Sequence, residues 1–189
     1  MTEQVLPPDG QLLAGIRAGD PVTLARLQAA YWNQLVRFAS RITEAGADPQ
    51  DVVQEAFIRL WTYRERWDAR GSVRALLFTV TRNAALDELR RRQRAVRASQ
   101  AADPPRAPPA PSEDAVAREL RDAAAAAVAG LPAQRREVFR LAREEGLTYA
   151  EIAAVLGLSP QTVANHMSLA LADLRRALEP FLPERGPPP

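Results

Sequence analysis

Hydrophobic residues recur three or four positions apart along most of the chain, which is the spacing of one face of an α-helix. One such stripe begins after Asp20 and consists of Leu24, Leu27, Tyr31, Leu35, Phe38 and Ile42. Another begins after Asp48 and consists of Val52 or Val53, Ala56, Phe57, Leu60 and Trp61. No segment shows the convincing apolar and polar alternation of a half-buried strand. The pattern therefore predicts an all-α fold.

Capping residues, proline and glycine mark the ends of these helices. Asp20-Pro21 and Asp48-Pro49 each combine an N-cap residue with a proline at the first helical position. Gly46 is expected to end the first of the two helices. Ser72 is an N-cap candidate for a further helix, because it precedes a long run without proline or glycine.

The stretch from Trp67 to Arg94 joins a buried half to a basic half. A polar loop, residues 68–71, precedes Ser72. We expect the first half to lie between neighbouring helices, because apolar residues leave it on several sides: Val73, Leu77, Phe78, Val80, Ala84, Ala85 and Leu89. The second half carries arginine at positions 90, 91, 92, 94 and 97, with few acidic partners. This excess of arginine favours a phosphate-binding surface over a solvated, salt-bridged helix end.

A proline-rich segment divides the chain. Residues 98–113 contain five prolines and no large apolar residue, which is typical of a semi-rigid linker. The fold is therefore expected to be two small helical domains joined by this linker. We expect a tail with a short helix over residues 1–19 and a first domain over residues 20–97. The linker then covers residues 98–114, the second domain residues 115–180, and a disordered tail residues 181–189.

The second domain contains the pattern of a helix-turn-helix. Thr148 and Glu151 form a capping box for a short helix, Gly157 permits a tight turn, and Ser159-Pro160 starts a second helix. Together with the small Ala153 and with Val163, this pattern favours DNA binding over an ordinary helical hairpin. In front of it, a helix capped by Ser112 offers its apolar residues for burial: Val116, Leu120, Ala123, Ala127 and Val128.

Composition excludes several classes of function. The chain of 189 residues has no cysteine and one histidine, so we expect no metal site and no cofactor. No apolar run approaches the roughly 20 residues of a membrane span. The acidic, proline-containing N-terminus is unlike a signal peptide. We therefore expect a cytoplasmic protein without membrane insertion.

The basic charge is concentrated in the first half of the chain. Residues 20–97 carry 14 Arg against 9 Asp and Glu, whereas residues 98–189 carry 10 Arg against 12 Asp and Glu. A positively charged domain attracts polyanions through the field of its summed charges. We therefore expect the first domain to bind a polyanion.

In their order along the chain, these motifs resemble bacterial sigma factors of the sigma-70 family, in the extracytoplasmic-function (ECF) group. DPQDVVQEAFIRLW resembles the segment that binds core RNA polymerase, and GSVRALLFTVTRNAALDELRRRQR resembles the segment that melts and reads the −10 promoter element. LTYAEIAAVLGLSPQTVANHMSLALADLRRAL resembles the segment that reads the −35 element. The resemblance covers residues 20–97 and 115–178.

The resemblance implies a protein that is not an enzyme and has no catalytic residues. Its implied partners are core RNA polymerase, promoter DNA and an anti-sigma factor, and its implied sites are three groups of residues. The polymerase contact falls on Asp48, Asp51, Gln54, Glu55 and Arg59. Contacts to the single-stranded −10 element fall on Trp67, Arg70, Ser72, Arg74, Arg82, Asn83, Asp87, Arg90 and Arg91. Contacts to the duplex −35 element fall on Ser159, Gln161, Thr162, Asn165, His166 and Ser168.

The residues themselves support strand capture, because an aromatic beside a polar loop and a basic helix suits the stacking of unpaired bases. Trp67 as an ordinary core residue remains the alternative. The sequence departs from the family in two ways: Leu76 replaces a usual tryptophan, and the recognition helix is neutral at four positions that are commonly basic, Ala164, His166, Leu169 and Leu171. Two other functions stay open, a helix-turn-helix regulator that acts without polymerase and a helical interaction module.

Overall fold

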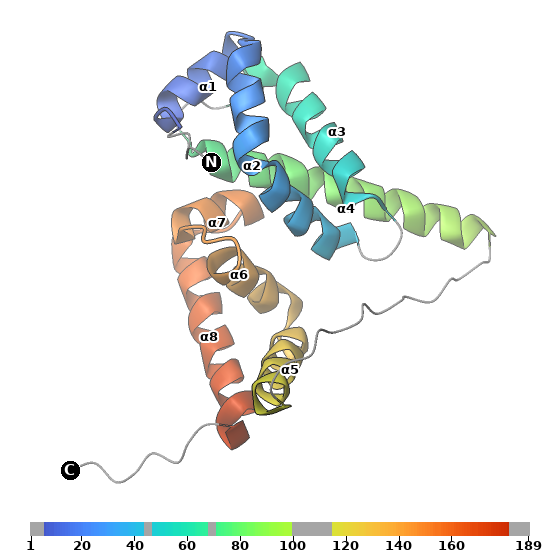
Figure 1. Ribbon diagram of the computed structural model, residues 1–189, viewed down its shortest axis with the longest axis vertical. Helices are drawn as coiled ribbons and strands as arrows, with labels where there is room; N and C mark the ends of the chain where they lie inside the picture. The colour runs from blue at the N-terminus through green and yellow to red at the C-terminus, as the bar shows by residue number, and fades with distance from the viewer. Residues whose placement is uncertain (1–5, 44–46, 68–70, 100–114, 182–189) are drawn as a thin grey trace. The chain divides into compact units, whose positions relative to one another are not determined.

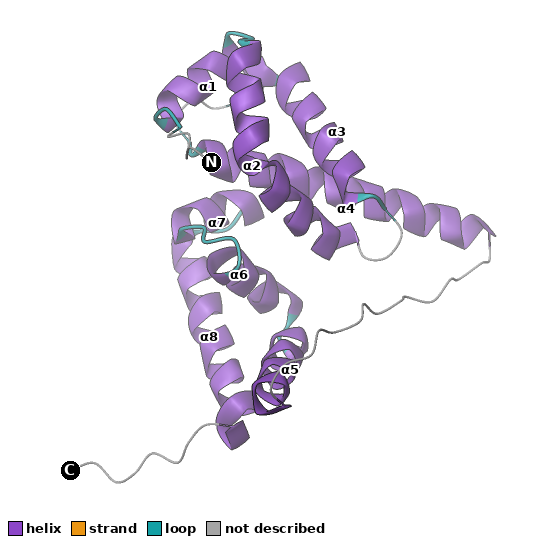
Figure 2. Cartoon of the chain, in the orientation of Figure 1, coloured by secondary structure: helices purple, strands orange, loops and turns teal. Residues whose placement is uncertain are grey.

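The computed structural model describes residues 6–43, 47–67, 71–99 and 115–181, and every regular element among them is helical (Figures 1 and 2). The all-α prediction is therefore confirmed for the described part of the chain. In order, the elements are α1 (Asp9–Arg17), α2 (Pro21–Thr43), α3 (Pro49–Thr62), the short 3-10 helix η1 (Arg64–Arg66), α4 (Val73–Ser99), α5 (Ala115–Gly130), α6 (Ala133–Arg143), α7 (Tyr149–Leu156), α8 (Pro160–Leu178) and η2 (Glu179–Phe181). Among the described helices, none combines the length and the apolar character that a membrane crossing requires.

The chain forms two compact units, of which the first contains α1 to α4 and the second contains α5, α6 and α8. In the first unit α2, α3 and α4 pack against one another, and α1 packs on α2 and α4 (Figure 1). The rings of Phe38 and Phe78 lie 4.9 Å apart between α2 and α4. The first half of α4 is buried as expected, through Val73, Leu77, Phe78, Val80, Ala84 and Ala85. Leu89 and Trp61 are only half-buried.

Local hydrogen bonds start the helices where the sequence predicts them. The Asp20 carboxylate accepts bonds from the amides of Val22 and Thr23, at 3.0 and 3.1 Å, and from the Thr23 hydroxyl at 2.6 Å. The Thr23 hydroxyl, followed by the Val22 amide, lowers the pKa of Asp20. Asp48 accepts from the Gln50 amide at 2.8 Å, and Ser72 from the Ala75 amide at 3.3 Å. The predicted cap at Ser112 and the predicted stop at Gly46 lie outside the described residues.

The second unit is organised around α8, which packs against both α5 and α6. Leu131, Ala170 and Leu174 form a buried cluster, and Ala127, Val128 and Phe139 pack against it. Leu120 departs from prediction, since its side chain is 46% exposed. The reason is that α5 meets this cluster through Ala127 and Val128, whereas Leu120 lies two turns earlier. The predicted Val116 lies outside the described side chains.

The helix-turn-helix forms as α7, a turn and α8. The capping box closes in both directions: the Glu151 carboxylate accepts from the Thr148 amide at 2.8 Å, and the Thr148 hydroxyl accepts from the Glu151 amide at 3.2 Å. Gly157 adopts φ +67°, and the amide of Leu158 donates to the carbonyl of Ala153 at 3.0 Å. This is the bond pattern that ends a helix with a left-handed residue. Ser159 then caps α8 by accepting from the Thr162 amide at 3.0 Å.

We expect Gly157→Ala to lower the free energy of unfolding by about 1–2 kcal/mol, the cost of left-handed backbone for a residue with a Cβ atom. A Cβ atom at position 157 would meet nothing within 4 Å, so the backbone conformation is the only source of this cost in the described surroundings. Gly130→Ala is the matched control, because its Cβ atom would also meet nothing within 4 Å and its φ is not positive. Urea unfolding of the two full-length variants measures the difference. Equal midpoints for both would contradict the expectation.

Candidate functional site

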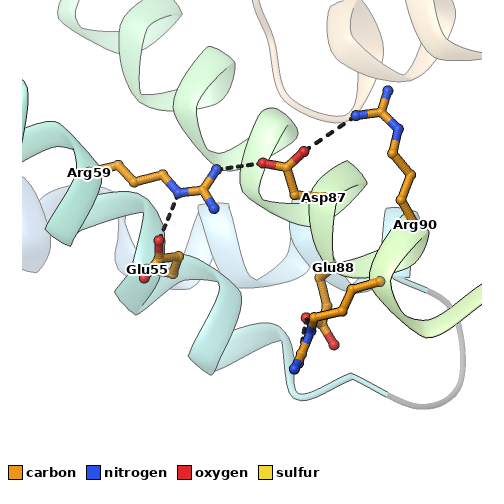
Figure 3. Close-up of polar contacts among 6 residues, drawn as sticks. Glu55, Arg59, Asp87, Glu88 and Arg90 are labelled. Atoms are coloured by element: carbon orange, nitrogen blue, oxygen red, sulfur yellow. Dashed lines mark hydrogen bonds and ion pairs between the residues drawn. The ribbon is translucent and has the colours of Figure 1, made fainter. Parts of the chain in front are cut away.

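The outward face of α3 is acidic at its start and is tied to α4 at its end. Asp48, Asp51, Gln54 and Glu55 are exposed on this face, and Asp48 also serves as the N-cap. Arg59 is held on both sides: its Nε donates to Glu55 at 2.7 Å, and its Nη1 donates to Asp87 of α4 at 2.7 Å (Figure 3). These two bonds raise the pKa of Arg59, the bond to Asp87 most of all.

The basic end of α4 contains more internal ion pairs than the sequence suggested. Asp87 also accepts from Arg90 at 3.3 Å (Figure 3), while Glu88 pairs with Arg91 and Arg92, each at 2.7 Å. The hydrogen bond from Arg92, followed by the one from Arg91, lowers the pKa of Glu88. The two carboxylates thus engage three of the arginines, because helical spacing places both of them one turn before the arginines, as in the salt-bridged helix end that the sequence left as the alternative. The three arginine side chains are 42–74% exposed, although Glu88 is only 17% exposed, and ion pairs of exposed arginines contribute little to stability.

A groove of about 490 Å³ runs between the acidic face of α3 and the basic end of α4. Its α3 wall includes Asp51, Glu55 and Arg59, and its α4 wall includes Arg91, Arg92 and Arg94 together with the carboxylates Asp87 and Glu88, so that acidic groups predominate on α3 and basic groups on α4. Arg94 bonds through Nε to the carbonyl of Arg90, at 3.3 Å. The groove thus places an acidic wall and a basic wall on one unit, a pairing that neither helix shows by itself. The predicted Arg97 lies outside the described side chains.

Ile58 is a part of the α3 surface that the predicted contact residues do not include. Its side chain is 53% exposed, and it lines a hollow with Glu55, Thr62 and Tyr63 beside the Arg59 bridge. A large apolar residue that falls off the buried stripe of its helix is the sequence signal that could have found it. Exposed apolar groups rimmed by charge are typical of protein interfaces.

Trp67 is fixed to α3 just before the polar loop. Its indole Nε1 donates to the carbonyl of Leu60 at 3.1 Å, and its own carbonyl accepts from Arg17 at 3.5 Å. The side chain is half-buried, an arrangement that favours the alternative of a core residue and that also anchors the start of the loop. Arg70 and most of the loop lie outside the described residues.

The remaining −10 candidates lie along α4. Ser72 is used as its N-cap, Arg74 and Arg82 are half-buried, and Asn83 is exposed. Asn83 and Asp87 lie one turn apart on this helix, followed by Arg90 a turn later. The structure therefore brings an exposed amide, a paired carboxylate and an arginine onto one face of α4.

The start of α8 presents a row of polar, uncharged side chains. Gln161, Asn165 and Ser168 are exposed, and Gln161 Nε2 donates to Asn165 Oδ1 at 3.1 Å. Ser159 and Thr162 are engaged in the cap. His166 is half-buried, and its Nδ1 is buried without a hydrogen-bond partner among the described residues.

Arginines of α6 are engaged in holding the second unit together. Arg135 donates to Asp173 of α8 at 2.6 Å, and Arg136 donates to the Leu131 carbonyl at 2.8 Å. Arg140 lies 3.9 Å from Glu144. The bridge between Arg135 and Asp173 joins α6 to α8 across 38 positions of sequence, so no local signal could have predicted it. Within the described residues, no group of His, Asp and Glu side chains is placed to hold a metal ion.

Comparison with known proteins agrees with this arrangement. The sequence matches the Sigma-70 region 2 family over residues 27–95 and the Sigma-70 region 4 family over residues 121–174. The ECF RNA polymerase sigma factor SigL of Mycobacterium tuberculosis is 33% identical over 169 residues, which are 88% of this chain and 95% of SigL. The chain therefore belongs to the ECF sigma factors of the sigma-70 family.

Two further similarities concern length and fold. The RfaY protein of Xanthomonas campestris pv. campestris is 32% identical over 166 residues, which are 85% of this chain but 42% of that protein. The structure of CnrH, solved in complex with the cytosolic domain of CnrY, is similar with a TM-score of 0.65 and 26% identity, and the match covers 92% of this chain and 99% of CnrH. Both matches include the two helical units rather than one of them.

Proposed function

We propose that the protein binds core RNA polymerase in the cytoplasm and directs promoter-specific initiation, with the first unit opening the −10 element and the second reading the −35 element. The observation that carries this proposal is the groove of the first unit, which has an acidic wall on α3 and a basic wall on α4. The basic wall suits the phosphates of a nucleic acid, whereas the acidic wall suits a basic patch on a protein partner. The polymerase performs the chemistry, while this chain selects the promoter and captures the strand.

Polymerase binding is assigned to the outward face of α3. Asp51, Gln54 and Glu55 are exposed there without contributing to the core. Glu55 and Arg59 form one ion pair, and Ile58 adds an apolar contact beside them. A charged rim around an apolar centre is the common anatomy of a protein interface.

Strand capture is assigned to the loop after Trp67 and to the exposed face of α4. Opening a promoter requires a surface that binds unpaired bases, and each stacked base contributes about 1–3 kcal/mol. Unstacking a base costs a few kcal/mol, which such a surface must offset. Asn83 offers an amide that can read base edges, whereas Arg82, Arg90 and Arg91 offer charges for phosphates.

Reading of the −35 element is assigned to Gln161, Asn165 and His166, with Ser168 beside them. The helix between Pro160 and Leu174 has no basic residue other than His166, and Arg135 and Arg136 of α6 are bonded within the unit. Hydrogen bonds to base edges therefore supply most of this contact, with little release of counterions. The bond between Gln161 and Asn165 orients both amides before DNA arrives.

Regulation by an anti-sigma protein completes the proposal. CnrH, which is similar over most of this chain, was solved in complex with the cytosolic domain of CnrY. An inhibitor that covers the acidic face of α3 would compete with the polymerase for the same residues.

Transcription in vitro tests the function. Purified protein is mixed with core polymerase on a library of random-sequence duplexes, and the starts of the transcripts are mapped by sequencing. We expect starts only when both proteins are present, downstream of shared −10 and −35 sequences. Binding to duplex DNA without any initiation would instead support the regulator that acts without polymerase.

A further inference from the structure

Asp87 lies in the middle of the α4 face that carries the candidate strand contacts. It follows Asn83 by one turn and precedes Arg90 by another, and its side chain is 51% exposed. An unpaired carboxylate in that position would repel phosphate groups. Its charge must therefore be balanced before a nucleic acid strand can approach this face.

The balance comes from two helices. Arg90 belongs to α4 itself and lies 3.3 Å from Asp87 Oδ1, whereas Arg59 reaches from α3 to Asp87 Oδ2 at 2.7 Å (Figure 3). The Arg59 contact is the shorter, and the Arg59 side chain is the less exposed, at 31% against 66% for Arg90. Glu55 holds the other edge of the Arg59 guanidinium at 2.7 Å, so the group is fixed from both sides. A guanidinium that is fixed in this way loses less entropy in forming the bond to Asp87.

We propose that Arg59 is a positioning residue that neutralises Asp87, and that Asp87 limits the strength with which α4 holds phosphates rather than reading a base. With Asp87 intact, Arg90 divides its charge between that carboxylate and the strand. Removing the carboxylate frees Arg59 and Arg90 for phosphates, whereas removing Arg59 exposes the carboxylate to them. That the bound polyanion is single-stranded promoter DNA rests on the proposed function. The neutralisation of Asp87 by Arg59 does not depend on that function.

The test compares four full-length proteins: wild type, Arg59→Ala, Asp87→Asn and the double variant. Binding to a fluorescent oligothymidylate strand at low salt is the first measurement. We expect Asp87→Asn to bind about 2- to 5-fold more tightly and Arg59→Ala to bind about 2- to 5-fold more weakly, as for exposed charge pairs. The double variant should bind at least as well as wild type, because the carboxylate that Arg59 balances is gone.

Retention on heparin is the second measurement, because it reports phosphate-like binding whether or not the protein recognises promoters. We expect Asp87→Asn to elute at higher salt than wild type and Arg59→Ala at lower salt. Asp122→Asn and Arg143→Ala, on exposed positions of α5 and α6, make the same charge changes elsewhere and should shift elution less. The expected order on heparin together with no binding to oligothymidylate would reject strand capture but retain the charge balance.

Three results would overturn the proposal. Weaker binding by Asp87→Asn would show that its carboxylate contacts the strand directly. Failure of Asp87→Asn to restore binding in the Arg59→Ala background would show that Arg59 acts itself on phosphate or only on the fold. Elution of Asp87→Asn and Arg59→Ala from heparin at the same salt concentration as wild type would show that the pair has no electrostatic role. The urea midpoints of all four proteins show whether any change comes from unfolding instead.

Discussion

The Asp51→Arg/Glu55→Arg double variant is expected to lose association with core RNA polymerase by at least about 100-fold, since placing like charges across an interface costs several kcal/mol. The two residues lie one turn apart on the exposed face of α3 and take no part in the core. The variant should therefore remain folded. Co-elution of the purified protein with core enzyme on a sizing column measures the association, and unchanged co-elution would remove this face from the interface.

Control variants separate the charge of the α3 face from its internal pairing. Arginine at position 55 also repels Arg59, which forms an ion pair with Glu55 at 2.7 Å in the wild-type protein. Asp51→Arg alone avoids this contact and should still weaken association. Charge reversal at Glu119 and Asp122, which are exposed on α5, should leave association unchanged. Loss of association in Arg59→Ala alone would indicate that polymerase binding depends on the ion pair between Arg59 and Asp87 rather than on the negative charge of the surface.

Asn83→Ala and Arg91→Ala are expected to weaken binding to the −10 strand in different ways. Asn83 is exposed, and an amide that pairs with a base edge contributes about 1–3 kcal/mol of discrimination. Its loss should relax base preference at one position. Arg91 should contribute equally for all sequences, because phosphate contacts carry no sequence information. Glu88 stays paired with Arg92 when Arg91 is removed, so the change does not expose a new negative charge.

Salt dependence distinguishes the two variants. Holoenzyme is titrated with non-template strands that vary one base at a time, at several salt concentrations. Log affinity falls linearly with log salt, and Arg91→Ala should make this dependence shallower by about 0.7, the value for one phosphate of a single strand. Asn83→Ala should keep the wild-type slope. An equal loss for every base in Asn83→Ala would reassign Asn83 to the structure of α4.

The sequence alone determined where five helices begin, namely α2, α3, α4, α7 and α8. Each cap joins residues within three positions of each other, as in Asp48 with Gln50 and Thr148 with Glu151. A bond of that kind depends only on the local backbone, so the order of residues is enough to predict it. Helical periodicity likewise identified the buried side of α4 and the acidic face of α3, and the order of motifs along the chain indicated the family.

Only the tertiary structure decided which of these surfaces meet. Arg59 and Asp87 are 28 positions apart, and their bond depends on how α3 and α4 are rotated about their axes. Periodicity gives the face of a helix but neither its rotation against a neighbour nor the reach of a long side chain. The same limit explains the bond from Trp67 to Leu60, the bridge from Arg135 to Asp173 and the exposure of Leu120. The candidate residues could therefore be predicted from the sequence, whereas the packing of the helices determined which charges remain available to a partner.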